Sequence, residues 1–127
     1  MSIMAQLFRK YGCEKIWHSY SDLYEADFEP MRNDPINILE VGTFRGESIN
    51  VWLEYFPNAT IYTIDTFGRV APEDLPMLKN SRVTYAKLDS TASECNKHFK
   101  ELGQKFDFII DDGLHTPEGQ QKTFDNL

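Results

Sequence analysis

The sequence has few cysteines and no spacing of them that would suggest a metal centre. Cys13 and Cys95 are the two cysteines among 127 residues. They stand too far apart for a zinc site or a redox motif. We therefore expect both to be reduced, buried thiols of a cytoplasmic protein.

Basic side chains are also scarce, since thirteen lysines and arginines face twenty acids and the net charge is −7. A protein that follows a phosphate backbone would show a basic face, so we expect no nucleic-acid partner. A neutral or cationic small molecule fits better, although solubility alone explains most of this charge. The sequence shows no signal peptide and no apolar run long enough to span a membrane, so no membrane partner is expected.

The length of 127 residues suits one domain. Apolar runs typical of strands alternate with helical spacing, and they predict strands over 36–41, 60–64, 82–88 and 106–110. Helices are expected over 48–56, 92–102 and 117–126. This alternation predicts an α/β fold, a Rossmann-like doubly wound parallel sheet with helices on both faces. We expect a helical leader over 1–34 and the Rossmann-like core over 35–127.

Two helices carry more detailed predictions. The first, over 2–11, should place Ile3 and Leu7 on its inner side. The helix of 92–102 should be capped by Ser90 or Thr91. Its apolar face should consist of Ala92, Cys95, Phe99 and Leu102, and it should end at Gly103.

The first predicted strand leads into a glycine turn with the pattern E-x-G-x-x-x-G, formed by Glu40, Gly42 and Gly46. Glycines allow a ligand to approach the backbone closely. The next strand ends at Asp65, and ligands of parallel sheets bind beyond the carboxyl ends of the strands. An acid at that place can accept hydrogen bonds from both hydroxyls of a ribose, so the segment 36–65 predicts a nucleoside half-site.

The glycine spacing differs from the G-x-G-x-x-G pattern of dinucleotide-binding proteins. Glu40 would repel a pyrophosphate but could serve a cationic ligand. A nicotinamide-dependent oxidoreductase is therefore disfavoured, and a glycine turn in some other α/β domain remains the plain alternative.

Acids also end the other two strands. Asp89 and Ser90 follow the third strand, and Asp111, Asp112 and His115 follow the fourth. Each acid taken alone could simply cap the next helix, but four strand ends with acids at one sheet edge favour a ligand site.

E-x-G-x-x-x-G followed by an acid at the next strand end resembles the class I S-adenosylmethionine-dependent methyltransferases, from residue 36 to about 124. The segment D-D-G-L-H, residues 111–115, resembles the D-D-G-S-H element of metal-dependent sugar O-methyltransferases of the macrocin type and of cephalosporin hydroxylase-like proteins. Leu114 replaces the usual serine. The leader segment 18–32 is similar to that of the same subgroup, and the chain resembles this fold truncated after its fourth strand, without the C-terminal strands.

The resemblance implies roles for individual residues. His115 would be the general base, and Asp112 would be catalytic and a Mg²⁺ ligand. Further metal ligands would come from the next strand, beyond Leu127, so Asp111 and Asp112 alone would make a poor magnesium site. The cofactor-binding residues would be Glu40, Gly42, Thr43, Gly46, Asp65, Thr66, Asp89, Ser90 and Asp111, with Tyr20 or Tyr24 helping to close the site.

The resulting expectation is S-adenosylmethionine-dependent methylation of a hydroxyl oxygen on a sugar or natural product. The alternative is a truncated, non-catalytic domain that binds S-adenosylmethionine as a regulatory or assembly module. The fourth strand would expose one edge, so we also expect a homo-oligomer or a partner chain that covers it.

Overall fold

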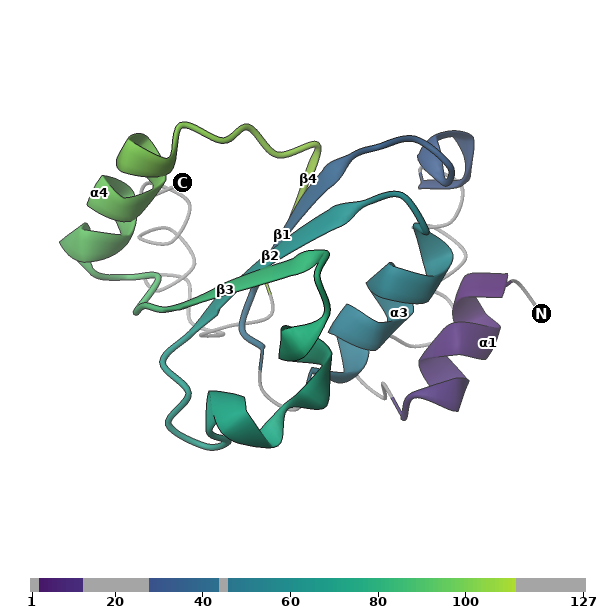
Figure 1. The fold of residues 1–127 in the computed structure, drawn as a ribbon, viewed down its shortest axis with the longest axis horizontal. Coiled ribbons are helices and arrows are strands. Elements are labelled where there is room, and N and C mark those ends of the chain that lie inside the picture. The colour runs from purple at the N-terminus through teal and green to yellow at the C-terminus, as the bar shows by residue number, and fades with distance from the viewer. Residues whose placement is uncertain (1–2, 13–27, 44–45, 112–127) are drawn as a thin grey trace.

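The computed structural model describes residues 3–12, 28–43 and 46–111 (Figure 1). The elements begin with α1 (Ile3–Lys10), the 3-10 turn η1 (Glu29–Met31), β1 (Asn37–Val41), α3 (Glu47–Tyr55) and β2 (Thr60–Asp65). They continue with the 3-10 turns η2 (Pro72–Asp74) and η3 (Pro76–Lys79), then β3 (Val83–Lys87), α4 (Ser93–Leu102) and β4 (Phe108–Asp111). All four predicted strands are therefore present, with bounds that differ from the predicted ones by one or two residues at most ends.

The strands form one parallel sheet in the order β3-β2-β1-β4. β1 is central, and it pairs with β2 on one side and with β4 on the other. Ile38, for example, pairs with Ile61 of β2 and with Phe108 of β4. The prediction of a parallel sheet is confirmed.

Helices cover both faces of the sheet, as Figure 1 shows with α3 and α1 on one side and α4 on the other. Successive strand residues point to opposite faces, so Ile38 and Ile61 pack with α3, whereas Leu39 and Ile64 pack with Cys95 of α4. From Ile38 to Val41 both faces of β1 are buried, which explains why these residues are apolar except at Glu40. The doubly wound arrangement is thereby confirmed.

Aromatic rings fill the core on the α3 side. Phe28 lies 4.3 Å from Phe108 and 5.6 Å from Phe56, measured between ring centroids, in edge-to-face geometry. Its ring also meets that of Trp52 at 6.2 Å. Phe28, from the expected leader, is thus part of the core, while Tyr20 and Tyr24, expected to help close the site, lie outside the described residues.

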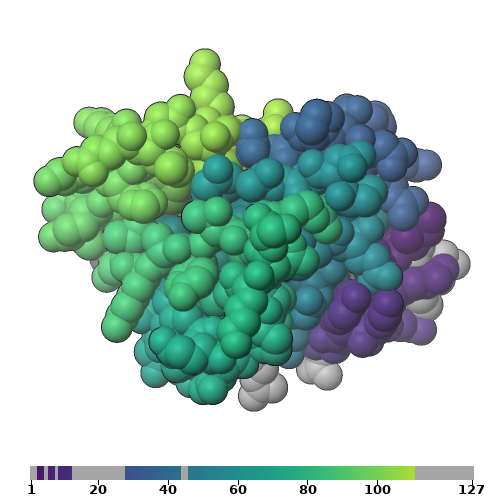
Figure 2. All heavy atoms as spheres, in the orientation of Figure 1, coloured from purple at the N-terminus to yellow at the C-terminus, as the bar shows by residue number. Residues whose placement is uncertain are grey.

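The inner side of α1 differs from the expected one. Met4 and Leu7 are buried, whereas Ile3 is 46% exposed, so the prediction that placed Ile3 inside was wrong. The helix lies against α3, and its end is held there by Glu54, which accepts hydrogen bonds from Lys10 Nζ (3.0 Å) and Tyr11 Oη (2.9 Å). These donors lower the pKa of the Glu54 carboxyl. Figure 2 shows the atoms of α1, in purple, packed against the side of the molecule.

The helix α4 also departs from its prediction. It begins after Ala92, with no side-chain cap, so neither Ser90 nor Thr91 caps it. Cys95 and Phe99 are buried as expected, but Leu102 is 40% exposed because it lies in the last turn, beyond the edge of the apolar cluster. Within the part of the chain that the structure describes, every helix is too short or too polar to cross a bilayer.

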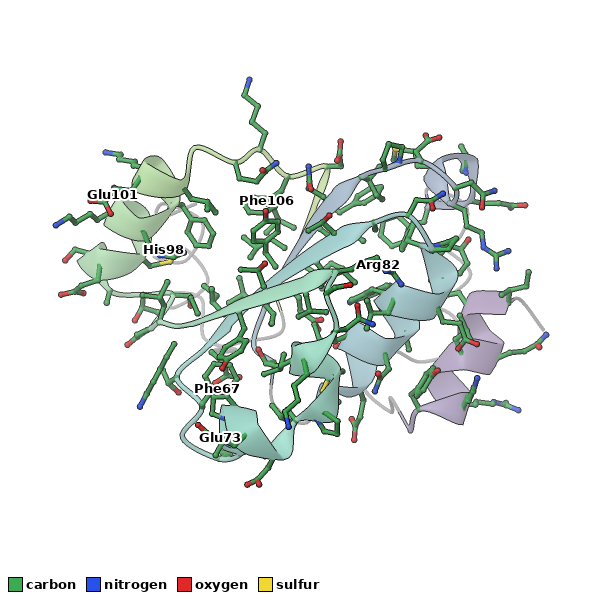
Figure 3. The ribbon with its side chains drawn as sticks, viewed as in Figure 1. Phe67, Glu73, Arg82, His98, Glu101 and Phe106 are labelled. Atoms are coloured by element: carbon green, nitrogen blue, oxygen red, sulfur yellow. The ribbon has the colours of Figure 1, made fainter. Side chains whose placement is uncertain are left out.

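Arg82, just before β3, closes the carboxyl end of α3 (Figure 3). Its guanidinium donates hydrogen bonds to the backbone carbonyls of Leu53 (2.7 Å), Phe56 (2.9 Å) and Ala59 (3.0 Å). Carbonyls at a helix end have no partner within the helix, and a cation is favourable there. A side chain from the β2–β3 connection thus satisfies the end of the preceding helix.

We expect Arg82→Met to lower the free energy of unfolding by about 1–3 kcal/mol, because charge-assisted hydrogen bonds to three carbonyls are lost. The matched control is Lys97→Met on the exposed side of α4, which removes the same charge and should change stability by less than about 0.5 kcal/mol. Urea melts of the two variants and the parent chain measure both values. Equal shifts for the two variants would show that Arg82 acts only through its charge.

Candidate functional site

The strand register brings the predicted site residues to one edge of the sheet. Val41, the last residue of β1, pairs with Ile64 on one side and with Asp111 on the other. The N–H of Gly42 donates to the carbonyl of Ile64 at 2.9 Å. The glycine turn, Asp65 and Asp111 therefore lie at neighbouring carboxyl ends, which is the part of a parallel sheet where ligands bind.

Both glycines of the turn have left-handed backbones, with φ of +93° at Gly42 and +73° at Gly46. The N–H of Gly46 donates to the carbonyl of Thr43 at 2.8 Å, and Gly46 then forms the N-terminal cap of α3. This conformation explains why glycine is required at these positions.

Gly46 has a second reason to be glycine, and it is a contact within the protein. A Cβ built at this position would overlap the thioether of Met77, which belongs to η3. Sequence reasoning expected the glycine to admit a ligand, and it missed Met77 because η3 is distant in the chain. That a ligand approaches Gly46 stays a prediction.

Glu40 lies in the interior, with only 1% of its surface exposed. Its Oε1 accepts a hydrogen bond from the Ser48 hydroxyl, and its Oε2 accepts one from Trp52 Nε1 at 3.0 Å. Both donors belong to α3. The carboxylate therefore has a structural task that the sequence analysis did not identify, and its predicted service to a cationic ligand stays a prediction.

The signal for these partners was present in the helix. Ser48 and Trp52 stand four residues apart, on one face of α3. A buried carboxylate needs donors, and a buried indole N–H needs an acceptor. The acid in β1 and the two donors in the following helix could have been paired on that basis.

Thr43 is also buried, and its hydroxyl lies 2.6 Å from the hydroxyl of Thr63 in β2. Thr63 is the register neighbour of Glu40, so these polar groups occupy adjacent positions on the α3 face of the sheet. Thr63 was not among the predicted site residues, although a threonine among apolar strand residues is a signal for such a pair. The contact ties the glycine turn to β2.

Asp65 is half-buried at the end of β2, and a tight turn orients its carboxylate. Its Oδ1 accepts a hydrogen bond from the N–H of Phe67 at 2.9 Å, and the Thr66 hydroxyl lies 3.5 Å from the same oxygen. Phe67 has φ of +56°, which is unusual for a bulky residue. Strained backbone of this kind is concentrated at functional sites, so the turn supports the prediction for Asp65.

The Phe67 side chain helps to hold this turn. Its ring packs edge-to-face on the ring of Tyr85, with centroids 5.7 Å apart, and it also joins the apolar cluster of the α3 face. Figure 3 labels Phe67 in the loop that follows β2. The ring contact links the end of β2 to β3.

Asp89 forms the turn that precedes α4. Its Oδ1 accepts hydrogen bonds from the Thr91 N–H (2.9 Å) and hydroxyl (2.6 Å). Burial, and secondarily the charge of Asp89, raise the pKa of the Cys95 thiol. The predicted contact of Asp89 and Ser90 with a ligand stays a prediction, and the turn is the simpler role that the sequence also allowed.

The remaining site residues extend past the described part of the chain. The backbone of Asp111 ends β4 beside Val41, while Asp112 and His115 lie outside the described residues. Among the described side chains, no group of three or more histidines, cysteines or acids could hold a metal ion. The predicted base and metal ligand are therefore untested.

Known proteins are similar in sequence to this chain over most of its length, although no protein-family model matches it. It is 28% identical to 8-demethyl-8-(2-methoxy-alpha-L-rhamnosyl)-tetracenomycin-C 3'-O-methyltransferase of Streptomyces olivaceus, over 98% of this chain and 33% of that protein. It is 26% identical to demethylmacrocin O-methyltransferase of Streptomyces fradiae, over 87% of this chain and 28% of that protein.

The relatives of this chain are O-methyltransferases. The resemblance inferred from the glycine turn and the D-D-G-L-H segment is thereby confirmed. The chain spans about a third of the length of the curated relatives it matches.

Solved structures show the same fold. MycE methyltransferase from the mycinamycin biosynthetic pathway, in complex with Mg and SAH, superposes with a TM-score of 0.82 at 23% identity, over 99% of this chain and 36% of that one. A complex of MycE with Mg, SAH and mycinamycin VI gives a TM-score of 0.83 over 33% of its chain. The Rossmann-like fold is thus confirmed, and the described part corresponds to a portion of it.

We expect Gly46→Ala to destabilise the fold by about 1–2 kcal/mol, since an alanine at positive φ is strained. The flexible thioether of Met77 can move aside, so strain in the backbone should account for most of the lost stability. Urea melts of Gly46→Ala, Met77→Ala and the double variant separate the two terms. If adding Met77→Ala to Gly46→Ala removed the whole loss of stability, that loss would come from the steric overlap and not from the backbone conformation.

Proposed function

We propose that this chain binds S-adenosylmethionine at the carboxyl edge of its sheet and serves an O-methyltransferase that acts on a hydroxyl of a sugar or natural product. One observation carries the proposal: the glycine turn and the oriented carboxylate of Asp65 occupy neighbouring strand ends. The O-methyltransferase relatives support the same chemistry.

The described residues fit a nucleoside cofactor. Asp65 presents a half-buried carboxylate whose Oδ1 is already oriented by the Phe67 N–H, and such a group can accept hydrogen bonds from ribose hydroxyls. Gly42 lies at the neighbouring strand end, with its N–H bonded to the Ile64 carbonyl. The other predicted contacts are Thr43, Gly46, Thr66, Asp89, Ser90 and Asp111, with Glu40 beneath the turn.

The cofactor, when bound, supplies a methyl group that is activated by a sulfonium and is transferred to the acceptor oxygen. A sugar hydroxyl is a poor nucleophile at neutral pH. His115 would take the hydroxyl proton as general base, and Mg²⁺ held in part by Asp112 would lower the pKa of that hydroxyl. MycE, which was solved with Mg and SAH, supports a magnesium-assisted reaction.

The acceptor is proposed from the relatives. One methylates a rhamnosyl-tetracenomycin, and MycE was solved with mycinamycin VI, so a glycosylated natural product is the acceptor class we propose. A cytoplasmic location, and the absence of nucleic-acid and membrane partners, stay predictions.

Self-association or a partner chain is a further part of this proposal. Among the described residues, no strand pairs with the side of β4 that faces away from β1. Ile109 of β4 is 51% exposed. An unpaired strand edge invites another strand, so the expected homo-oligomer or covering chain stays a prediction.

The Asp65 prediction uses an isosteric change. Asp65→Asn keeps an acceptor for the Phe67 N–H but removes the charge that ribose hydroxyls would meet. We expect it to weaken S-adenosylhomocysteine binding by about 1–3 kcal/mol, or roughly 5- to 150-fold. Isothermal titration calorimetry measures the affinity.

The control for this experiment is Asp107→Asn at the opposite end of the sheet, where Asp107 accepts a hydrogen bond from the Asn37 N–H. That variant should bind like the parent chain. Unchanged affinity in a folded Asp65→Asn variant would remove Asp65 from the site, and a parent chain without affinity would contradict the proposed function itself.

His115→Ala should lower turnover by about 10²- to 10⁴-fold, the usual contribution of a general base, and should leave cofactor affinity nearly unchanged. His98→Ala on α4 is the matched control and should keep full activity. S-adenosylhomocysteine release with mycinamycin VI or demethylmacrocin as acceptor reports turnover.

A chelator should abolish this turnover, and added Mg²⁺ should restore it. Equal losses of turnover and cofactor affinity in His115→Ala would point to a structural role for the histidine. Cofactor binding without turnover on any acceptor would favour the non-catalytic alternative.

A further inference from the structure

We propose that Ser48 and Trp52 are positioning residues that hold the glycine turn in its binding conformation through the buried carboxylate of Glu40. The consequence for the cofactor rests on the proposed function. Sequence reasoning assigned Glu40 to direct ligand contact, and the proposal replaces that contact by an indirect one.

Glu40 and Ser48 stand on either side of the glycine turn in the chain. Glu40 comes two residues before Gly42, and Ser48 comes two residues after Gly46. The hydrogen bond from the Ser48 hydroxyl to Glu40 Oε1 therefore joins the two ends of the turn directly. Trp52, one helical turn farther along α3, donates to the other carboxylate oxygen at 3.0 Å.

The direction of the carboxylate supports the same conclusion. Glu40 is 1% exposed, and each of its two carboxylate oxygens accepts a hydrogen bond from a side chain of α3. Charge-assisted hydrogen bonds in a buried setting are strong and directional. The carboxylate thus faces the helix, and its influence on a ligand at the sheet edge passes through the turn.

The other side of the turn is already anchored. The Gly42 N–H is bound to the Ile64 carbonyl, the Thr43 hydroxyl contacts that of Thr63, and Met77 lies against Gly46. The Glu40 contacts supply the corresponding anchor on the α3 side. Without them, the start of α3 could shift relative to β1 while the β2 side stayed in place.

The test uses the full chain with Ser48→Ala, which removes the hydroxyl donor, and Trp52→Phe, which removes the indole N–H together with part of the buried ring. Val51→Ala is the matched control, because Val51 is buried in the same helix and the same apolar cluster. Hydrogen exchange of the Gly42 and Gly46 amides, followed by NMR, reports the turn, and the Leu88 amide, bonded to the Asp65 carbonyl, is the reference.

We expect both donor variants to accelerate exchange at Gly42 and Gly46 on the order of tenfold relative to Leu88, the effect of one lost hydrogen bond on a local opening. Val51→Ala should accelerate all three amides alike. Unchanged relative exchange in both donor variants would overturn the proposal, whether or not the chain binds a cofactor.

Calorimetry with S-adenosylhomocysteine tests whether these contacts affect cofactor binding. Positioning predicts that Ser48→Ala and Trp52→Phe weaken binding on the order of tenfold, as Glu40→Gln does, while Val51→Ala does not. If Glu40→Gln alone weakened binding, Glu40 would contact the ligand directly and the proposal would be wrong. A parent chain that binds no ligand contradicts the proposed function, and the exchange experiment still decides the role of the turn.

Discussion

A carboxylate buried in the central strand of a sheet has to be hydrogen-bonded, and this requirement constrains the whole α3 side of the molecule. Glu40 accepts hydrogen bonds from two donors of α3, Ser48 and Trp52. An uncompensated buried charge would cost several kcal/mol, of the order of 3–5. The rotation of α3 and its position along β1 follow from this constraint, because both donors must face the same side chain. The glycine turn between β1 and α3, and the contact of Met77 with Gly46, depend on where α3 begins.

Much of the fold could be predicted from local patterns. Most of the strands are short apolar runs, and the glycines and prolines mark where helices stop, so the presence of β1 to β4 and their parallel direction followed from the alternation. The errors occurred where tertiary contacts override local preference. Ile3 is exposed because α1 packs Met4 and Leu7 into the core instead, and Ala92 stands at the start of α4 because Asp89 forms a turn with Thr91 before it.

The residues of the candidate site also fall into two groups, those that local patterns predict and those whose contacts depend on tertiary packing. Asp65 and the glycine turn could be placed from sequence, since strand ends and glycine spacing are local features. The donors of Glu40 left a signal in the helical spacing of Ser48 and Trp52. The contacts of Thr43 and Gly46 depend on how β2 and η3 pack against the turn. The turn at Phe67 belongs to this second group as well: its left-handed backbone is stable only because Asp65 accepts its N–H and Tyr85 supports its ring.

The pairing of β1 with β4 has a consequence for how the chain reaches this structure. β1 and β2 are neighbours in sequence and can associate early, but the other edge of β1 meets residues about seventy positions later, as the bond between Asn37 and Asp107 shows. Contacts between such distant residues require a large loop to close, which slows folding. During synthesis β1 therefore keeps one edge unpaired until β4 has left the ribosome. A partly made chain is accordingly more open to chaperone binding and to aggregation than a chain in which β4 has paired with β1.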